Sequence, residues 1–264
     1  MQVQGKVVVV TGGANGIGKA LAEIFHREGA ATVVVADLDI ANAEAVAASV
    51  NGAAFKTDVG KESDISHLIA MTERQFGPIA LFCSNAGIGG GFDPLSINAG
   101  GNSDDPWMKS WAINVMAHVY AARHLVPLMQ ARGGGYFLNT VSAAGLLSQV
   151  GSAAYSTTKH AAVGFAENLA ISHRAHGIKV SILCPQGVDT NMLRGLPKGP
   201  QSSDGNLSPE AVAAAALDGI AHEQFLILPH PQVSGYMRAK LDNYDRWIGG
   251  MAKIQAKLRE AGGN

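Results

Sequence analysis

The fold of this 264-residue chain is decided near its start, by the stretch Thr11-Gly12-Gly13-Ala14-Asn15-Gly16-Ile17-Gly18. A valine-rich run at residues 7–10 precedes the stretch, and a helical pattern over residues 17–28 follows it directly. Glycine has no Cβ atom, so the backbone can approach a phosphate closely, and the N-terminus of the helix offers unpaired N–H groups to it. The stretch therefore predicts a pyrophosphate-binding turn between a strand and a helix.

Two other interpretations of this turn have to be weighed. Gly13 and Gly16 alone would fit an ordinary tight turn. Gly13, Gly18 and Lys19 also have the spacing of a loop that binds nucleoside triphosphates, but that loop needs a Ser or Thr hydroxyl for Mg²⁺ where this chain has Ala20. The missing hydroxyl favours a dinucleotide over a triphosphate.

Short apolar runs alternate with longer helical patterns along the chain. The helical patterns include residues 17–28, 40–50, 63–76 and 155–176, and the strand candidates are residues 7–10, 32–36, 53–57, 79–83, 136–139, 180–184 and 225–228. Strands this apolar need cover on both faces, and strict alternation places a helix in each crossover. We predict a Rossmann-type, doubly wound α/β fold with about seven parallel strands and helices on both faces. Residues 1–264 would form a single dinucleotide-binding and catalytic domain, with a C-terminal helical extension from about residue 232.

Composition narrows the functions that have to be considered. The chain is 47% hydrophobic and 16% charged, and its formal net charge of -1 gives no basic excess for DNA or RNA. We expect no nucleic-acid partner. No segment approaches the roughly 20 apolar residues needed to cross a bilayer, and the start lacks the pattern of a signal peptide, so we expect a cytoplasmic protein without a membrane partner.

Cys83 and Cys184 end apolar runs and are expected to be free buried thiols. The scattered histidines lack metal-ligand spacing, so no metal site is predicted.

Two stretches interrupt the alternation of strands and helices, at residues 87–106 and 187–209. Both follow a predicted strand, and in open parallel sheets ligands bind beyond the carboxyl ends of the strands. We expect both stretches to lie over a ligand site. The alternative is that they are ordinary surface loops.

Asp37 closes the second predicted strand, where a dinucleotide-binding unit places an acid that accepts hydrogen bonds from the adenosine ribose. Its charge would repel the 2′-phosphate of NADP, and Ala14, Asn15 and Leu38 supply no cation for that phosphate. The sequence therefore predicts NAD as the cofactor. Alternatively, Asp37 or Asp39 only caps the helix that follows.

Together with later motifs, the glycine turn resembles the TGxxxGxG signature of the short-chain dehydrogenases/reductases, and the resemblance continues to about Thr190. Asp58-Val59 resembles the family's pair beside the adenine ring, and Asn85-Ala86-Gly87 resembles its motif after the fourth strand. The resemblance implies the following cofactor-binding residues: Gly12, Asn15, Gly16, Ile17, Gly18, Asp37, Leu38, Asp58, Val59, Asn85, Ala86, Gly87, Tyr155, Lys159, Pro185, Val188 and Thr190.

The same resemblance implies a catalytic set of Asn114, Ser142, Tyr155 and Lys159, which occur in the family's order and element contexts. Tyr155 would take the alcohol proton while hydride leaves the same carbon for the nicotinamide, and Ser142 would hydrogen-bond the substrate oxygen. Lys159 would also bind the nicotinamide ribose, and Asn114 would hold a water that links Lys159 to solvent. Taken singly, the four residues could be a helix-kink hydrogen bonder, a turn residue, a core aromatic and a solvated charge.

The spacing of Tyr155 and Lys159 agrees with this chemistry. Residues four apart project from the same helical face, so Lys159 can act on Tyr155. A phenol with a pKa near 10 is a poor base at neutral pH, but a nearby ammonium and the positive nicotinamide both favour the phenolate. We therefore expect the pKa of Tyr155 to be lowered. A shift of about 3 units would need roughly 4 kcal/mol of differential stabilisation.

One motif departs from the family pattern. Where the family usually has Pro-Gly-x-Val-x-Thr, this chain has Pro185-Gln186-Gly187-Val188-Asp189-Thr190. We expect Val188 and Thr190 still to bond the nicotinamide carboxamide, and Gln186 to project toward the substrate.

Substrate contacts are expected from residues that follow strands or lie in the second loop. The candidates are Ala144, Gln149, Gln186, Met192 and Leu193, together with Leu146, Leu147 and Leu196. Most of them are apolar, which indicates a hydrophobic secondary alcohol or ketone; packing in the core explains the leucines and the methionine equally well.

The sequence thus predicts an NAD(H)-dependent alcohol dehydrogenase or carbonyl reductase that acts on a small-molecule alcohol or ketone. Two alternatives stay open, an NADPH-dependent 3-oxoacyl or other carbonyl reductase and a non-catalytic dinucleotide-binding sensor. By resemblance, helices over residues 107–128 and 153–171 would form the interface of a homotetramer or homodimer. The chain from residue 234 onward is expected to pack against a neighbour or over the pocket.

Overall fold

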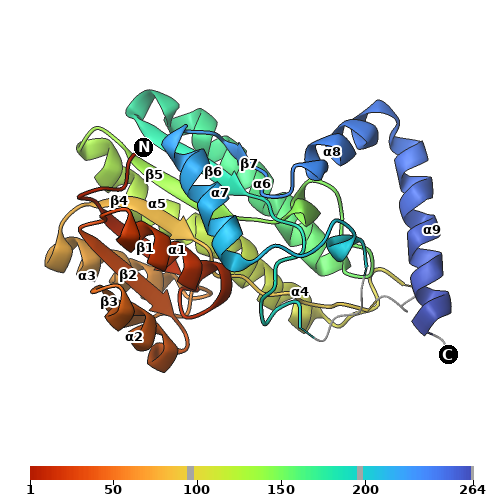
Figure 1. Cartoon of the computed structure of the whole chain (residues 1–264), viewed down its shortest axis with the longest axis horizontal. Helices are drawn as coiled ribbons and strands as arrows, with labels where there is room; N and C mark the ends of the chain where they lie inside the picture. The colour runs from red at the N-terminus through yellow and green to blue at the C-terminus, as the bar shows by residue number, and fades with distance from the viewer. Residues whose placement is uncertain (94–97, 195–198, 263–264) are drawn as a thin grey trace.

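The structure, a computed structural model, describes residues 1–93, 98–194 and 199–262 (Figure 1). Its centre is a sheet of seven parallel strands in the order β3-β2-β1-β4-β5-β6-β7. The strands are β1 (Val7–Thr11), β2 (Thr32–Asp37), β3 (Ala53–Lys56), β4 (Ile79–Ser84), β5 (Gly135–Thr140), β6 (Ile178–Leu183) and β7 (Leu226–Ile227). The predicted doubly wound parallel sheet is confirmed, and each strand lies where the apolar runs placed it, within two residues at either end.

Helices cover both faces of the sheet. The α-helices of the described residues are α1 (Gly16–Arg27), α2 (Ile40–Ser49), α3 (Glu62–Phe76), α4 (Asp104–Trp111), α5 (Ala117–Ala131), α6 (Ala153–His173), α7 (Pro209–Ala221), α8 (Gln232–Asp242) and α9 (Tyr244–Gly262). Apolar residues of α1, α2 and α7 share one buried cluster with one face of the sheet, and those of α3, α5 and α6 share a second cluster with the other face. Two cores therefore fix the sheet in the middle layer.

The helical pattern at residues 107–128 is interrupted, contrary to the continuous helix that the sequence predicts. The structure has α4, then a π-helical turn at Ala112–Met116, then α5. Asn114 lies within this turn and is completely buried. Single π-helical turns inside α-helices are frequent at functional sites.

The strand order places a crevice at the carboxyl end of β1. Chain connections run one way from β1 through β2 to β3 and the other way from β4 through to β7, so the order reverses between β1 and β4. Ligands of open α/β sheets bind at such a switch point. The glycine turn after β1 and the Asn85-Ala86-Gly87 motif after β4 both lie there.

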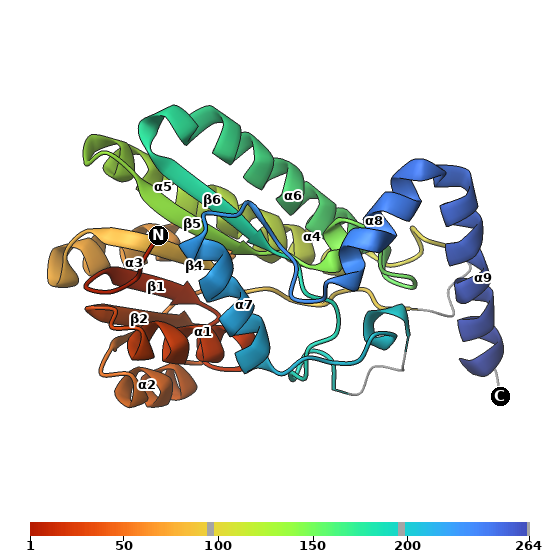
Figure 2. The same cartoon turned by 45° about the horizontal axis from the view of Figure 1, so that its top comes forward.

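Both views show α8 and α9 at one edge of the molecule, with α9 standing apart from the sheet and its helical layers (Figures 1 and 2). We call residues 232–262 the C-terminal arm. Whether residues 1–264 are best described as one domain with this extension stays a proposal.

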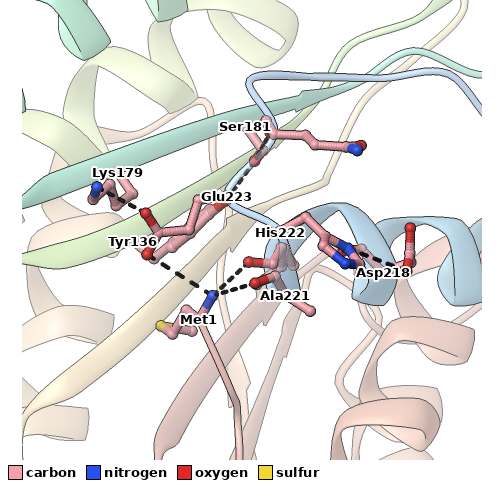
Figure 3. A network of polar contacts seen from close by, with 10 residues as sticks. Met1, Tyr136, Lys179, Ser181, Asp218, Ala221, His222 and Glu223 are labelled. Atoms are coloured by element: carbon pink, nitrogen blue, oxygen red, sulfur yellow. Dashed lines mark hydrogen bonds and ion pairs between the residues drawn. The ribbon is translucent and has the colours of Figure 1, made fainter.

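A polar network ties β5 and β6 to the end of α7 (Figure 3). The Tyr136 hydroxyl of β5 lies 2.7 Å from Ser181 Oγ of β6, and Lys179 forms a 2.7 Å ion pair with Glu223. The amino group of Met1 donates to the carbonyl oxygens of Ile220 and Ala221. These contacts lie at the amino ends of β5 and β6, away from the crevice.

Within the described ranges, no helix combines the length and apolar character required to cross a bilayer. The described residues also contain no group of three or more His, Cys, Asp or Glu side chains placed to hold a metal ion. Cys83 and Cys184 are buried free thiols.

Candidate active site

A single large cavity of about 1160 Å³ runs along the carboxyl ends of the strands. Its lining includes every residue that the sequence assigned to catalysis, cofactor or substrate, except Asn114, Leu146 and Leu196. Asn114 is buried behind the wall, Leu146 packs against the core instead, and Leu196 lies outside the described residues. The volume exceeds the roughly 300–1,000 Å³ typical of small-molecule pockets, which leaves room for a dinucleotide and a second molecule.

The glycine turn is held in place by the motif that follows β4. Thr11 Oγ1 accepts hydrogen bonds from the backbone N–H groups of Asn85 and Ala86, and Asn85 Nδ2 donates to the carbonyl oxygens of Thr11 and Gly12. Asn85 thus acts on the cavity through the glycine turn as well as lining it.

A positive φ together with a close neighbour explains two of the glycines. Gly12 has a φ of +64°, and a Cβ atom there would lie 2.8 Å from Ala86 Cα. Gly16 has a φ of +52°, and its Cβ would lie 3.1 Å from Thr190 Cγ2. Thr190, which follows β6, therefore lies beside the start of α1, as a residue that contacts the cofactor should.

Asp37 and Asp39 have different surroundings at the end of β2. The Asp37 carboxylate accepts from Ala14 N at 3.0 Å and from Asp39 N at 3.1 Å, and it lines the cavity. Asp39 caps α2 by accepting from Asn42 N. Asp39, and not Asp37, is therefore the residue that caps the helix. Each Asp37 oxygen accepts one backbone hydrogen bond and keeps a free lone pair for a ribose hydroxyl.

Asp58 and Val59 line the cavity on the side of β3, next to the start of α3. Asp58 Oδ1 accepts from Gly60 N, and its backbone N–H donates to Asp64. These bonds fix the chain direction where the resemblance places the adenine ring.

Ser142, Tyr155 and Lys159 converge at the other end of the cavity. Ser142 Oγ accepts from Ala144 N at 3.1 Å and donates to Pro185 O at 3.5 Å, and it also hydrogen-bonds the Tyr155 hydroxyl. Lys159 is only 3% exposed; its Nζ donates to Thr140 O and lies 5.7 Å from the centre of the Tyr155 ring. A strand end and one helical face thus bring a hydroxyl, a phenol and an ammonium together.

Burial opposes the ionisation expected of this pair. It lowers the pKa of Lys159 to about 8, and it raises the pKa of the Tyr155 phenol in spite of the hydrogen bond from Ser142. In the chain by itself, desolvation of the phenolate outweighs the stabilising contacts. The expected lowering of the pKa of Tyr155 also involves the positive nicotinamide, and it stays a prediction for the cofactor complex. The positive charge of a bound nicotinamide would favour the phenolate.

Asn114 uses its side chain to hold the loop after β4. Its Oδ1 accepts from Ile88 N, and its Nδ2 donates to Ile88 O and Thr158 Oγ1. A Cβ atom on Gly87 would lie 3.3 Å from Asn114 Oδ1 and 3.4 Å from Lys159 Nζ, so both side chains back this glycine. The structure therefore brings Asn114 beside Lys159, but both N–H groups of the Asn114 side chain are bonded to Ile88 and Thr158.

Gln186 lines the cavity, and its backbone N–H donates to Nδ1 of the buried His230. Its side-chain Oε1 is buried and has no hydrogen-bond partner among the described residues. A buried amide oxygen without a partner is costly, so this group is available to a ligand.

Two features near the site were not among the predicted site residues. One is the part of the arm that lines the cavity, Tyr236, Ala239, Trp247, Met251, Ile254, Lys257 and Leu258. Its helical spacing was visible, but the sequence did not decide between a neighbour and the pocket. The other is His118 on α5, which is 2% exposed and whose Nδ1 lies 2.7 Å from Ser84 Oγ. The charge of the nearby Lys159 contributes to lowering the pKa of His118. No local motif marks it.

Comparison with known proteins agrees with this geometry. The family model for short chain dehydrogenases matches residues 6–201. The 1-deoxy-11-beta-hydroxypentalenate dehydrogenase of Streptomyces exfoliatus is 32% identical over 256 residues, covering 94% of this chain and 91% of that protein. The 3beta-hydroxysteroid dehydrogenase 2 of Eggerthella lenta is 32% identical over 232 residues, covering 80% of this chain and 86% of that protein.

A solved structure is similar as well. The short chain dehydrogenase/reductase from Burkholderia phymatum, in complex with NAD, aligns with a TM-score of 0.81 at 28% identity, covering 93% of this chain and 96% of that one. With the sheet order, the glycine turn and the Ser142, Tyr155 and Lys159 arrangement, these matches show that the chain belongs to the short-chain dehydrogenase/reductase family.

Proposed function

We propose that this protein is an NAD(H)-dependent oxidoreductase that interconverts a secondary alcohol and a ketone carried on an apolar body. One observation supports the proposal most strongly: a single cavity joins Asp37 at one end to Ser142, Tyr155 and Lys159 at the other. Asp37 and the glycine turn suit the adenosine and pyrophosphate parts of a dinucleotide, and the opposite end suits acid–base chemistry on an alcohol.

In this proposal the alcohol loses a hydride from its carbon and a proton from its oxygen, and the two leave for different acceptors. A bound nicotinamide would supply the acceptor for the hydride of the carbinol carbon, and Tyr155 would take the hydroxyl proton. In the direction of reduction, Tyr155 returns that proton to the ketone oxygen. Ser142 is suited to hold the substrate oxygen, because its hydroxyl lies beside the Tyr155 hydroxyl and its bond to Pro185 O is long, at 3.5 Å.

Lys159 and Asn114 support this exchange of protons. One N–H donor of Lys159 is used by Thr140 O, which leaves its others for the ribose of the nicotinamide. Because the Asn114 amide is bonded to Ile88 and Thr158, a water held at this residue would have to use the second lone pair of Oδ1 or the backbone carbonyl of the π-helical turn.

The choice of NAD over NADP rests on charge. The cations in the described lining are Lys159 and Lys257, and neither belongs to the segments around Asp37. A 2′-phosphate beside Asp37 would therefore meet a carboxylate without a compensating cation.

The substrate class rests on the apolar lining beyond Tyr155, formed in part by Leu147, Met192 and Leu193. Two similar proteins are named as dehydrogenases of a pentalenate and of a 3beta-hydroxysteroid. A rigid polycyclic alcohol fits both the lining and the cavity volume.

An NADPH-dependent 3-oxoacyl or other carbonyl reductase is the second candidate. It uses the same Ser142, Tyr155 and Lys159 arrangement, and only Asp37 distinguishes the two. A non-catalytic sensor would have no need for that arrangement. Assembly into a homotetramer or homodimer and a cytoplasmic location stay predictions.

The direct test mixes the protein with NAD⁺ or NADP⁺ and a panel of aliphatic, aromatic and steroid alcohols, and follows the absorbance of reduced nicotinamide. We expect NADH to form with apolar secondary alcohols and little NADPH to form. Equal use of both cofactors would contradict the role of Asp37, and no turnover with any alcohol or ketone would contradict the proposed function.

A further inference from the structure

The C-terminal arm is fastened to the rim of the cavity by a buried lysine. Lys240 of α8 is 7% exposed, and its Nζ donates to the carbonyl oxygens of Leu146 at 2.8 Å and Leu147 at 3.0 Å. These carbonyls belong to the segment that begins at Ser142. Lysine is almost never fully buried unless it is paired, so this contact represents a specific attachment.

The same ammonium holds the beginning of α9. Lys240 Nζ lies 5.3 Å from the centre of the Tyr244 ring and 4.9 Å from that of Trp247, and the two rings meet edge-on. Both distances are within the range of cation–π attraction. Lys240 therefore connects the loop after β5 with both helices of the arm.

Two further contacts fix α8 from the side of β6. The Tyr236 hydroxyl donates to the Asp204 carboxylate at 2.9 Å. The backbone N–H of Val233 donates to the carbonyl oxygen of His230, and the His230 ring accepts from Gln186 N through Nδ1. Gln186 and Asp204 belong to the loop that follows β6, and Leu146 and Leu147 belong to the loop that follows β5. The arm is therefore attached to both of these loops.

One face of α9 completes the wall of the cavity. Trp247, Met251, Ile254 and Leu258 all line it, and their spacing of four, three and four residues puts them on one side of the helix. The neighbouring Ile248 is outside the lining and 51% exposed. The apolar face of α9 is thus turned toward the same space that contains Tyr155.

We propose that this apolar face of α9 binds the far end of a bulky, rigid apolar alcohol or ketone, and that Lys240 is the positioning residue that holds the arm over it. The proposal rests on the proposed function for the reacting end of the substrate and adds the recognition of its other end. The family match ends at residue 201, so the arm lies beyond the segment shared through that match. A small alcohol would contact Ser142 and Tyr155 but would not reach α9.

The test compares cyclohexanol with a 3-hydroxysteroid at saturating NAD⁺. Trp247→Ala and Met251→Ala remove the apolar wall, and Ile248→Ala is the matched control on the outward side of α9. We expect each wall variant to raise KM for the hydroxysteroid roughly tenfold or more, as for lost apolar contacts in a substrate pocket, while the constants for cyclohexanol and for NAD⁺ stay within about twofold.

Lys240→Met should likewise raise KM for the hydroxysteroid and leave the constants for cyclohexanol unchanged. Lys240→Arg keeps the cation, so its KM for the hydroxysteroid should lie between those of the parent and Lys240→Met. Lys253→Met removes an exposed charge from α9 and should change neither alcohol. A merely structural role of Lys240 would instead lower turnover of both alcohols together, with no rescue by Arg.

Binding is measured separately from turnover, by calorimetric titration of the hydroxysteroid into NADH-loaded protein. If the parent turns over no alcohol, the proposed function fails, but weaker hydroxysteroid binding by Trp247→Ala than by Ile248→Ala would still support the arm. Equal binding by these two variants, no binding by the parent, or a change confined to the oligomeric state on size-exclusion chromatography would overturn the inference.

Discussion

At the residue scale, Asp37 and Asp39 lie two positions apart and have different roles. Asp37 faces the cavity and is proposed to select the cofactor, whereas Asp39 caps α2. Asp37→Ala removes the acceptor offered to the ribose, so we expect KM for NAD⁺ to rise roughly tenfold or more and the use of NADP⁺ to increase. Asp39→Ala is the matched control: loss of the α2 cap should cost about 1 kcal/mol of stability and leave the cofactor preference unchanged. Initial rates with both cofactors decide the matter; an Asp37→Ala protein that still prefers NAD⁺ by the parent's ratio would refute the assignment.

His118 gives a pH prediction. Burial, with a smaller effect of the Lys159 charge, lowers the pKa of His118 to about 3, so the folded protein resists protonation that the unfolded chain accepts below about pH 6.5. The unfolded state then binds more protons, and stability falls as the pH is lowered. We expect this residue alone to cost about 2 kcal/mol between pH 8 and pH 5.

The measurement is urea unfolding at both pH values. His118→Asn, which keeps a polar partner for Ser84, should lose less stability between pH 8 and pH 5 than the parent does. The exposed His67→Asn serves as the control and should behave as the parent. If His118→Asn and the parent lose the same amount, His118 is not kept neutral in the folded protein.

What the sequence could predict at this scale follows from how local each signal is. The family resemblance pointed to Tyr155 and Lys159, and their separation by one helical turn agrees with it. Asp37 was identified because it ends a strand. The raised pKa of Tyr155 and the buried contacts of Lys240 depend on atoms brought together from distant segments. Neither leaves a pattern in the neighbouring residues.

At the scale of elements, the turn between β1 and α1 is tightly constrained by the segment after β4. Gly12→Ala places a side chain at a φ of +64°, within 2.8 Å of Ala86 Cα. We expect a loss of more than about 1 kcal/mol of stability and weaker NADH binding. Gly164→Ala in α6, where a Cβ meets nothing within 4 Å, should instead gain roughly 0.5–1 kcal/mol.

Urea unfolding and fluorescence titration with NADH check both glycine variants. A Gly12→Ala protein with the parent's stability and NADH affinity would show that the turn is not built around the backbone approach to Ala86.

The interrupted helix around Asn114 shows where periodicity reaches its limit. The apolar spacing of residues 107–128 fits a continuous helix, since a π-helical turn adds only one residue and leaves most of the pattern intact. The hydrogen bonds of Asn114 to Ile88 and Thr158 accompany the break, and they depend on the loop after β4. The resemblance identified the residue, but the spacing did not identify the turn.

At the scale of the whole molecule, α5 and α6 leave an apolar groove between them, lined by Val119, Val126, Phe165 and Leu169 among others. We predict that copies of the chain associate through these helices. Phe165→Glu should shift the protein to a smaller species in light scattering after size-exclusion chromatography, because an unpaired carboxylate would be buried in the contact. Gln75→Glu, the same charge change on the surface of α3, should leave the assembly unchanged. A parent that is already monomeric would contradict this prediction.

The order of the strands accounts for the site as a whole. The reversal between β1 and β4 places the glycine turn and Asn85 side by side, and the loops after β5 and β6 bring Ser142, Gln186 and the arm to the same edge. Alternation along the sequence predicted this sheet. The position of the arm could not be predicted, because its attachment through Lys240 depends on two backbone carbonyls more than 90 residues earlier.

The proposed acid–base role of Tyr155 in NAD-linked hydride transfer is tested most directly with Tyr155→Phe. The change removes one hydroxyl and keeps the ring, so NADH affinity measured by fluorescence titration should match the parent. The rate of NADH formation from an alcohol that the parent oxidises should fall about 10²–10⁴-fold. A Tyr155→Phe protein that binds NADH and oxidises the alcohol as fast as the parent would contradict the account.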